Sequence, residues 1–170
     1  MNRSKNNYTK VLISLGSNEG DRERNLETAI EFLKETEALH DVTISSIYET
    51  EPIGVIDQPW FLNIAISGLT SMPLMNLLQL CKSIEYAMGR KPCVRWGQRN
   101  IDIDILLYGD TMLSLDQLQV PHPRMHERRF VLMPAAEIAG ERIHPAFNMT
   151  INELLRSCTD KSIVKELVSI

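Results

Sequence analysis

Residues 101–110 read IDIDILLYGD and have the pattern of a β-strand that ends in a turn. Side chains on a strand point alternately to its two faces, so the three isoleucines share one face while Asp102 and Asp104 share the other. The Gly-Asp pair that follows Tyr108 is typical of a turn. The stretch therefore predicts a strand over 101–108 with one apolar face and one face that carries two carboxylates.

The chain before this strand contains three further strand patterns and two helix patterns. Apolar runs and period-two alternation predict the strands, and apolar residues at i, i+3 and i+4 predict the helices. In chain order these elements are strand 11–15, helix 21–33 with Asp21 as N-cap, strand 42–48, strand 61–69, and helix 73–89 opened by Pro73 and ended by Gly89. The resulting order, β-α-β-β-α-β, predicts an α+β fold of the ferredoxin-like type, with helices packed on an antiparallel sheet.

The residues after 110 are expected to wrap this sheet rather than to form a second core. They predict a hairpin near 111–118, a helix over 132–138, a helix over 151–157 and a weakly helical tail over 161–168. A length of 170 residues suits one domain. We therefore expect a single domain over 1–170, with residues 1–8 flexible and residues 160–170 as a tail.

The composition excludes several classes of protein. A formal net charge of −4 gives no general attraction to nucleic acid or an anionic membrane. No apolar run approaches the roughly 20 residues that span a bilayer, and no apolar segment typical of a secretory signal follows the N-terminus. Three cysteines without a C-x-x-C pair argue against a disulfide framework or a thiolate zinc site. We expect a cytoplasmic protein that is a monomer or a weak homodimer.

The carboxylate pair is the main candidate for chemistry. On a strand the Cα atoms of Asp102 and Asp104 would lie roughly 6.5 Å apart, so both side chains can reach one metal centre. Oxygen ligands select hard cations such as Mg²⁺. Taken alone, the pair is better explained as the solvent face of an amphipathic strand. However, the preceding ten residues supply Arg90, Lys91, Arg95 and Arg99, and metal with arginines is the combination that a triphosphate requires.

Three other motifs bear on ligands. In PHPRMHERRF (121–130) the two histidines have a zinc-like spacing, but the flanking prolines oppose a helix, so contacts of His122, Arg124 and Arg128 with phosphate or adenine are preferred. The segment GSNEG (16–20) lacks the P-loop pattern and is interpreted as a structural turn. Phe61 and Asn63 share one strand face and suit a flat heterocycle that stacks and forms hydrogen bonds.

In these motifs the sequence resembles the 6-hydroxymethyl-7,8-dihydropterin pyrophosphokinase family, from about residue 11 to about 138. The matching pieces are LGSN (15–18), YETEPIG (48–54), DQPWFLN (57–63), IE (84–85), GR (89–90), RWG (95–97), RNIDID (99–104), VPH (120–122), Arg128 and Phe130. The resemblance implies a ferredoxin-like fold and transfer of pyrophosphate from ATP to the pterin hydroxymethyl group in folate biosynthesis, with release of AMP.

The resemblance also implies roles for single residues. Asp102 and Asp104 would bind two Mg²⁺ ions, and Arg90 and Arg99 would be the catalytic arginines. The ATP site would comprise Glu85, Arg90, Arg95, Arg99, Ile105, His122 and Arg128. The pterin site would comprise Thr50, Ile53, Phe61, Asn63, Trp96 and Phe130.

The sequence departs from the family pattern at a few positions. Pro123 stands where a tyrosine can follow the histidine, Glu51 replaces a proline, and Phe61 replaces a tyrosine. The loop between Arg90 and Arg95 is one residue shorter. None of these changes touches the carboxylate pair.

Two other functions fit parts of the sequence. A two-metal phosphohydrolase could use the same aspartates with water as nucleophile, although Phe61, Asn63 and Phe130 would then have no role. A non-catalytic ferredoxin-like module could bind RNA or a regulatory ligand, but a pI of about 5.6 does not favour RNA.

Overall fold

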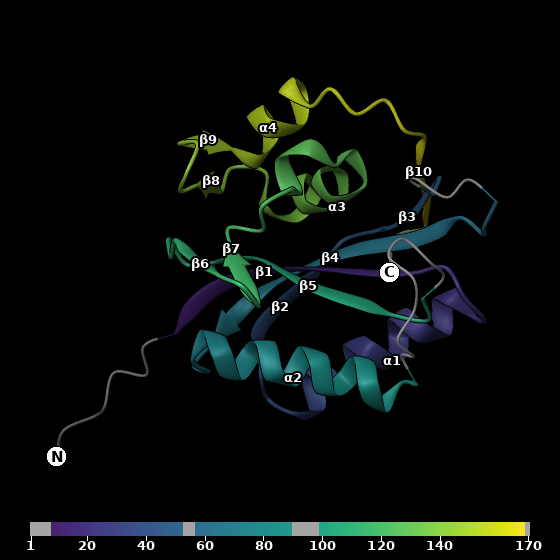
Figure 1. Cartoon of the computed structure of the whole chain (residues 1–170), viewed down its shortest axis with the longest axis horizontal. Coiled ribbons are helices and arrows are strands. Elements are labelled where there is room, and N and C mark those ends of the chain that lie inside the picture. The colour runs from purple at the N-terminus through teal and green to yellow at the C-terminus, as the bar shows by residue number, and fades with distance from the viewer. Residues whose placement is uncertain (1–7, 53–56, 90–98, 169–170) are drawn as a thin grey trace, which may run out of the picture.

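The computed structural model describes residues 8–52, 57–89 and 99–168. Its main sheet has the order β10-β3-β4-β1-β5, and β2 also pairs with β4 (Figure 1). The strands are β1 (Thr9–Ser17), β2 (His40–Ile44), β3 (Ile47–Thr50), β4 (Phe61–Thr70), β5 (Asp102–Tyr108) and β10 (Val164–Val168). All of their pairings are antiparallel. With two helices in the expected places, this confirms the ferredoxin-like fold.

Helices lie on both faces of the sheet (Figure 1). On one face α1 (Arg22–Glu35) and α2 (Leu74–Ala87) enclose a core that contains Ile101, Ile103 and Ile105. On the other face α3 (Arg129–Ala139) and α4 (Ile151–Ser157) enclose a second core that contains Leu106. The strand β5 therefore separates two apolar layers, and its aspartates lie on the side of α3.

Smaller elements complete the fold. The hairpin predicted near 111–118 is formed by β6 (Leu113–Leu115) and β7 (Leu118–Val120), and a short 3₁₀ helix (Met125–Glu127) precedes α3. A second hairpin joins β8 (Ile143–His144) to β9 (Met149–Thr150) before α4. Cys81 and Cys158 are buried and unbridged, as expected, while Cys93 lies outside the described residues. No described helix is long and apolar enough to cross a membrane.

Two helix ends follow from local chemistry, whereas the start of α3 depends on a remote contact. Asp21 caps α1 by accepting a hydrogen bond from the Arg24 amide at 3.1 Å. Pro73 is the N-cap of α2, so the helix begins at Leu74, one residue later than predicted, and Gly89 follows that helix with φ of +83°. α3 begins at Arg129 rather than at 132, because the distant Asp160 carboxylate accepts the Arg129 amide at 2.8 Å. Sequence pattern could not reveal that remote cap.

The single strand predicted over 42–48 is wrong, since the structure has two strands that break at Ser45-Ser46. Side chains take over polar contacts at the break. The Ser45 hydroxyl accepts the Ala65 amide at 2.9 Å, and the Ser46 amide donates to the Glu137 carboxylate at 3.0 Å. Glu137 comes from α3, so the break is fixed by a tertiary contact.

The helical tail predicted over 161–168 is also wrong, because this segment forms β10 against β3. A weak helical preference over a few residues is easily outweighed by pairing with an available strand edge.

Candidate active site

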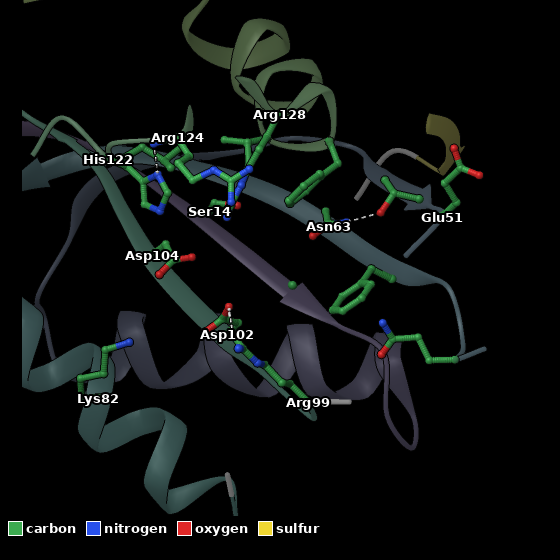
Figure 2. Close-up of a pocket in the computed structure, with 17 residues that line it drawn as sticks. Ser14, Glu51, Asn63, Lys82, Arg99, Asp102, Asp104, His122, Arg124 and Arg128 are labelled. Carbon is green, nitrogen blue, oxygen red and sulfur yellow. Dashed lines mark hydrogen bonds and ion pairs between the residues drawn. The ribbon is translucent and has the colours of Figure 1, made fainter. Parts of the chain in front are cut away.

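A cavity of about 340 Å³ opens between β5, β1, β4 and the start of α3 (Figure 2). Its lining divides by chemistry into two halves. The charged half contains Lys82, Arg99, Asp102, Asp104, His122, Arg124 and Arg128. The aromatic half contains Thr50, Glu51, Phe61, Asn63 and Phe130. Ser14, Gly16, Gln58, Leu106 and Val131 complete the lining.

Strand register brings the two halves together. Gly16 of β1 is the partner of Asn63 on β4 and of Asp102 on β5. The three residues therefore form a row across adjacent strands. Two strand spacings separate the Cα atoms of Asn63 and Asp102, which is about 10 Å. An ideal Cβ on Gly16 would lie 2.7 Å from the Asn63 side-chain oxygen. The glycine thus leaves room for the amide to lie between the halves.

The charged half holds the two aspartates on one strand face, as predicted. Arg99 Nη1 lies 2.7 Å from Asp102 Oδ2, and Figure 2 shows this ion pair below Asp104. Burial and the negative charge of Asp102 raise the pKa of Asp104 to about 6. A bound cation would relieve this repulsion, so the donor chemistry fits a hard metal ion.

The described residues contain no group of three or more His, Cys, Asp and Glu side chains able to hold a metal. Two carboxylates are a sufficient protein contribution for Mg²⁺, because that ion usually retains water and phosphate oxygens in its shell. The two carboxylates therefore fit a metal ion whose remaining ligands would be water and the oxygens of a phosphorylated ligand.

The histidine of this half is held as a neutral ring. The His122 amide donates to the Leu106 carbonyl at 2.9 Å, which fixes the residue beside β5. Its Nδ1 accepts the Arg124 amide at 3.2 Å and so carries no proton. Burial and the charge of Arg128 lower the pKa of His122 to about 4. With Nδ1 unprotonated, the neutral ring carries its proton on Nε2 and can donate it to a ligand oxygen.

His122 is therefore expected to stay neutral across the physiological range. In an NMR titration of the ligand-free protein, its ring resonances should shift with a midpoint below pH 5. The folded-state pKa lies below the unfolded value of 6.5, so the stability that this group contributes is present at neutral pH and lost as pH falls through about 4. A midpoint near 6.5 would contradict this environment.

The aromatic half is fixed by a buried amide. Asn63 is 3% exposed, and its Nδ2 donates to Thr50 Oγ1 at 2.7 Å. Thr50 is also the cross-strand partner of Phe61. The Arg128 guanidinium carbon lies 5.8 Å from the centre of the Phe130 ring. Amide and rings together can hold a flat polar heterocycle, which would stack and receive hydrogen bonds.

Asn18 ties two loops to the cavity. Its side chain accepts the Arg99 amide at 2.8 Å, and donates to the Gln58 side chain and the Pro59 carbonyl, both at 3.2 Å. The segment 16–20, interpreted from sequence as a structural turn, ends β1 at Gly16 and Ser17 and turns only after them, and Asn18 also positions Arg99.

Ten of the residues predicted to contact ligands line one cavity. They are Thr50, Phe61, Asn63, Arg99, Asp102, Asp104, His122, Arg124, Arg128 and Phe130. Arg90, Arg95, Trp96 and Ile53 lie outside the described residues. The Ile105 side chain is instead buried in the core beneath the sheet, and the buried Glu85 accepts the Ile103 amide at 2.8 Å from α2.

Sequence reasoning missed Lys82 as a site residue. Its ammonium group lies 3.1 Å from the Glu85 carboxylate and lines the cavity on the Asp104 side (Figure 2). The i, i+3 spacing from Glu85 was the available signal, but it is common on exposed helices. Glu51, Gln58, Ser14 and Gly16 were not selected as ligand contacts either.

The fold and the cavity together define a class of protein. A ferredoxin-like sheet carries a carboxylate pair, several cations and an adjoining aromatic pocket, which is the equipment of an enzyme that transfers a phosphate-containing group to a heterocyclic acceptor.

The chain belongs to the 7,8-dihydro-6-hydroxymethylpterin-pyrophosphokinase family, whose model matches residues 12–140. It is 46% identical over 157 residues to the 2-amino-4-hydroxy-6-hydroxymethyldihydropteridine pyrophosphokinase of Bacillus subtilis, covering 92% of this chain and 94% of that protein. A mitochondrial folate synthesis bifunctional protein of Arabidopsis thaliana is 42% identical, covering 79% of this chain and 24% of that protein. The chain is thus an ATP-dependent pyrophosphokinase.

Solved structures support the fold. The Plasmodium falciparum HPPK-DHPS structure aligns with a TM-score of 0.71 and 17% identity, covering 91% of this chain and 46% of that chain.

Proposed function

We propose that this pyrophosphokinase transfers the pyrophosphoryl group of ATP to the hydroxymethyl oxygen of 6-hydroxymethyl-7,8-dihydropterin, releasing AMP, as a step of folate biosynthesis. The observation that carries this proposal is the row Asn63-Gly16-Asp102. It joins a pocket for a flat heterocycle directly to a carboxylate pair. Two substrates bound in the two halves would meet above Gly16.

The pterin would occupy the aromatic half. Phe61 and Phe130 offer ring faces, and the Asn63 amide offers a fixed acceptor and donor. Because Asn63 is buried and already bonded to Thr50, its orientation is set before the pterin binds. Such preorganisation reduces the entropy lost on binding.

The triphosphate of ATP would occupy the charged half. Arg99, Lys82 and Arg128 surround the aspartates with positive charge, and the neutral His122 adds a hydrogen-bonding ring. Asp102 and Asp104 would hold two Mg²⁺ ions, which when bound would neutralise phosphate charge and acidify the acceptor hydroxyl. The roles of Arg90, Arg95, Trp96 and Ile53 stay predictions, as do the cytoplasmic location and the monomeric or weakly dimeric state.

The chain's own contribution is positioning and charge. The acceptor oxygen would attack the β-phosphorus of ATP in line with the departing AMP, a reaction that requires no covalent nucleophile. Asn63 and Thr50 would fix the pterin, while Arg99 would exchange its ion pair with Asp102 for contact with phosphate oxygens. That exchange would make Arg99 available only when the charged ligand is present.

The direct test is to incubate the purified protein with MgATP and 6-hydroxymethyl-7,8-dihydropterin and to measure AMP and ADP. We expect AMP in equal amounts with pterin pyrophosphate, and no AMP when the pterin is omitted. Formation of ADP and phosphate would reject pyrophosphoryl transfer, and phosphate release without pterin would indicate a phosphohydrolase.

A further inference from the structure

We propose that strand β10, together with Ile163 directly before it, is a positioning element for the aromatic half of the cavity, acting through the main chain of Ile163 on Glu51. The proposal rests on the proposed function, since it concerns binding of the pterin. It assigns a role to a segment for which the sequence predicted only a weakly helical tail.

The contact begins as ordinary strand pairing and continues into the cavity wall. Val164 of β10 is the partner of Thr50, the last residue of β3. Beyond β3, the Glu51 amide donates to the Ile163 carbonyl at 3.2 Å. The Ile163 amide in turn donates to the Glu51 side-chain oxygen at 2.7 Å. Glu51 is thus bonded to Ile163, the residue that leads into β10, through both its main chain and its carboxylate.

The residues held in this way belong to the aromatic half. Phe61, Thr50 and Val164 are successive partners across β4, β3 and β10. Thr50 is 2% exposed and accepts the Asn63 amide at 2.7 Å. A shift of Thr50 would therefore move the side chain that orients Asn63. Without β10 one edge of this row would be unpaired, and a terminal strand residue beside a loop is the first to fray.

A second contact reaches the other side of the same half. Lys165 Nζ lies 5.3 Å from the centre of the Trp60 ring. The Trp60 carbonyl accepts a hydrogen bond from Arg22 at 2.7 Å, and Arg22 pairs with Glu49 at 3.0 Å. β10 therefore contacts the residue before Phe61 as well as the residue after Thr50.

The side chains of β10 and of Ile163 are largely exposed, which indicates that this segment positions the cavity wall more than it stabilises the core. Ile163 is 46% exposed and Leu167 is 43% exposed, and Lys165 and Glu166 are exposed as well. A strand that buries little apolar surface contributes little to the free energy of unfolding. Besides its main-chain pairing with β3, the strand contacts the Trp60 ring through Lys165, and Ile163 before it bonds to Glu51. Trp60 and Glu51 belong to the two segments that bracket the aromatic half.

The test variant is Ile163→Pro, which removes the amide donor while replacing a side chain that is already exposed. Ile163→Ala is the matched control, because it keeps the amide. We expect Ile163→Pro to raise the KM for the pterin about fivefold, the effect of roughly one lost hydrogen bond, with the KM for ATP and the thermal unfolding midpoint unchanged. Ile163→Ala should match the wild type in all three.

Lys165→Met provides a second, milder variant that keeps the amide pattern of β10. We expect it to raise the KM for the pterin about twofold to threefold, as loss of an exposed cation–π contact would. If Ile163→Pro does not fold, an unchanged pterin KM in Lys165→Met would overturn the inference. Equal increases in both KM values, or a lower unfolding midpoint with unchanged KM values, would also overturn it.

The wild type in the same assay separates this inference from the proposed function. A wild type that forms no AMP from ATP and the pterin would reject the function. A wild type that is active, with variants that bind the pterin normally, would reject only the role of β10.

Discussion

Replacing Asp104 by asparagine is expected to lower the rate of AMP formation by about 10³-fold without unfolding the protein. Loss of a fixed charge that acts on the transferred group typically costs two to three orders of magnitude, and Asn has one neutral oxygen where Asp offers two charged ones. The measurement is single-turnover AMP release, with circular dichroism to verify the fold. Asp116→Asn, an exposed carboxylate in the β6–β7 turn, is the matched control and should retain activity.

Stability in metal-free buffer provides an independent readout for Asp104→Asn. Burial and the charge of Asp102 raise the pKa of Asp104 from 3.8 to about 6. Between these pH values the folded state binds more protons than the unfolded state, so this group makes the wild type less stable as pH rises. Asparagine does not ionise, so Asp104→Asn does not lose stability in this way as pH rises. The variant should be at least as stable as the wild type at pH 7.5. Near-normal AMP formation, or marked destabilisation at that pH, would contradict the assigned environment.

Replacing Gly16 by alanine is expected to raise the KM for the pterin about 30-fold or more. The added methyl group would lie 2.7 Å from the Asn63 oxygen, which is closer than real contacts allow. Asn63 would have to move, and both its bond to Thr50 and its bond to the pterin would weaken. Two hydrogen bonds of ordinary strength are together worth about this factor. Steady-state kinetics with each substrate varied in turn would measure the effect.

A double-mutant cycle identifies the cause of the Gly16 effect. Asn63→Ala removes the atoms that the new methyl group would meet, so Gly16→Ala should add little in that background. Additive losses would show that Gly16 acts through something other than Asn63. Unfolding midpoints of all four proteins distinguish a local clash from damage to β1.

The sequence alone determined the elements that rest on local pattern. The alternation in IDIDILLY fixed which face of β5 carries Asp102 and Asp104, because side chains alternate on any strand. The same alternation placed Phe61 and Asn63 on one face. Local capping signals placed the start of α1 at Asp21 and the end of α2 before Gly89. Family motifs then connected these positions to a pyrophosphokinase.

The tertiary structure decided what depends on contacts between distant segments. Pairing with the free edge of β3 made a strand of residues 164–168, and a carboxylate on α3 helped to break the strand at Ser45-Ser46. Packing of α2 brought Lys82 to the cavity. Register across three strands set Gly16 between Asn63 and Asp102, which defines how the two halves meet. No local pattern encodes such placements, because each arises from hydrogen bonds or packing between residues far apart in the chain.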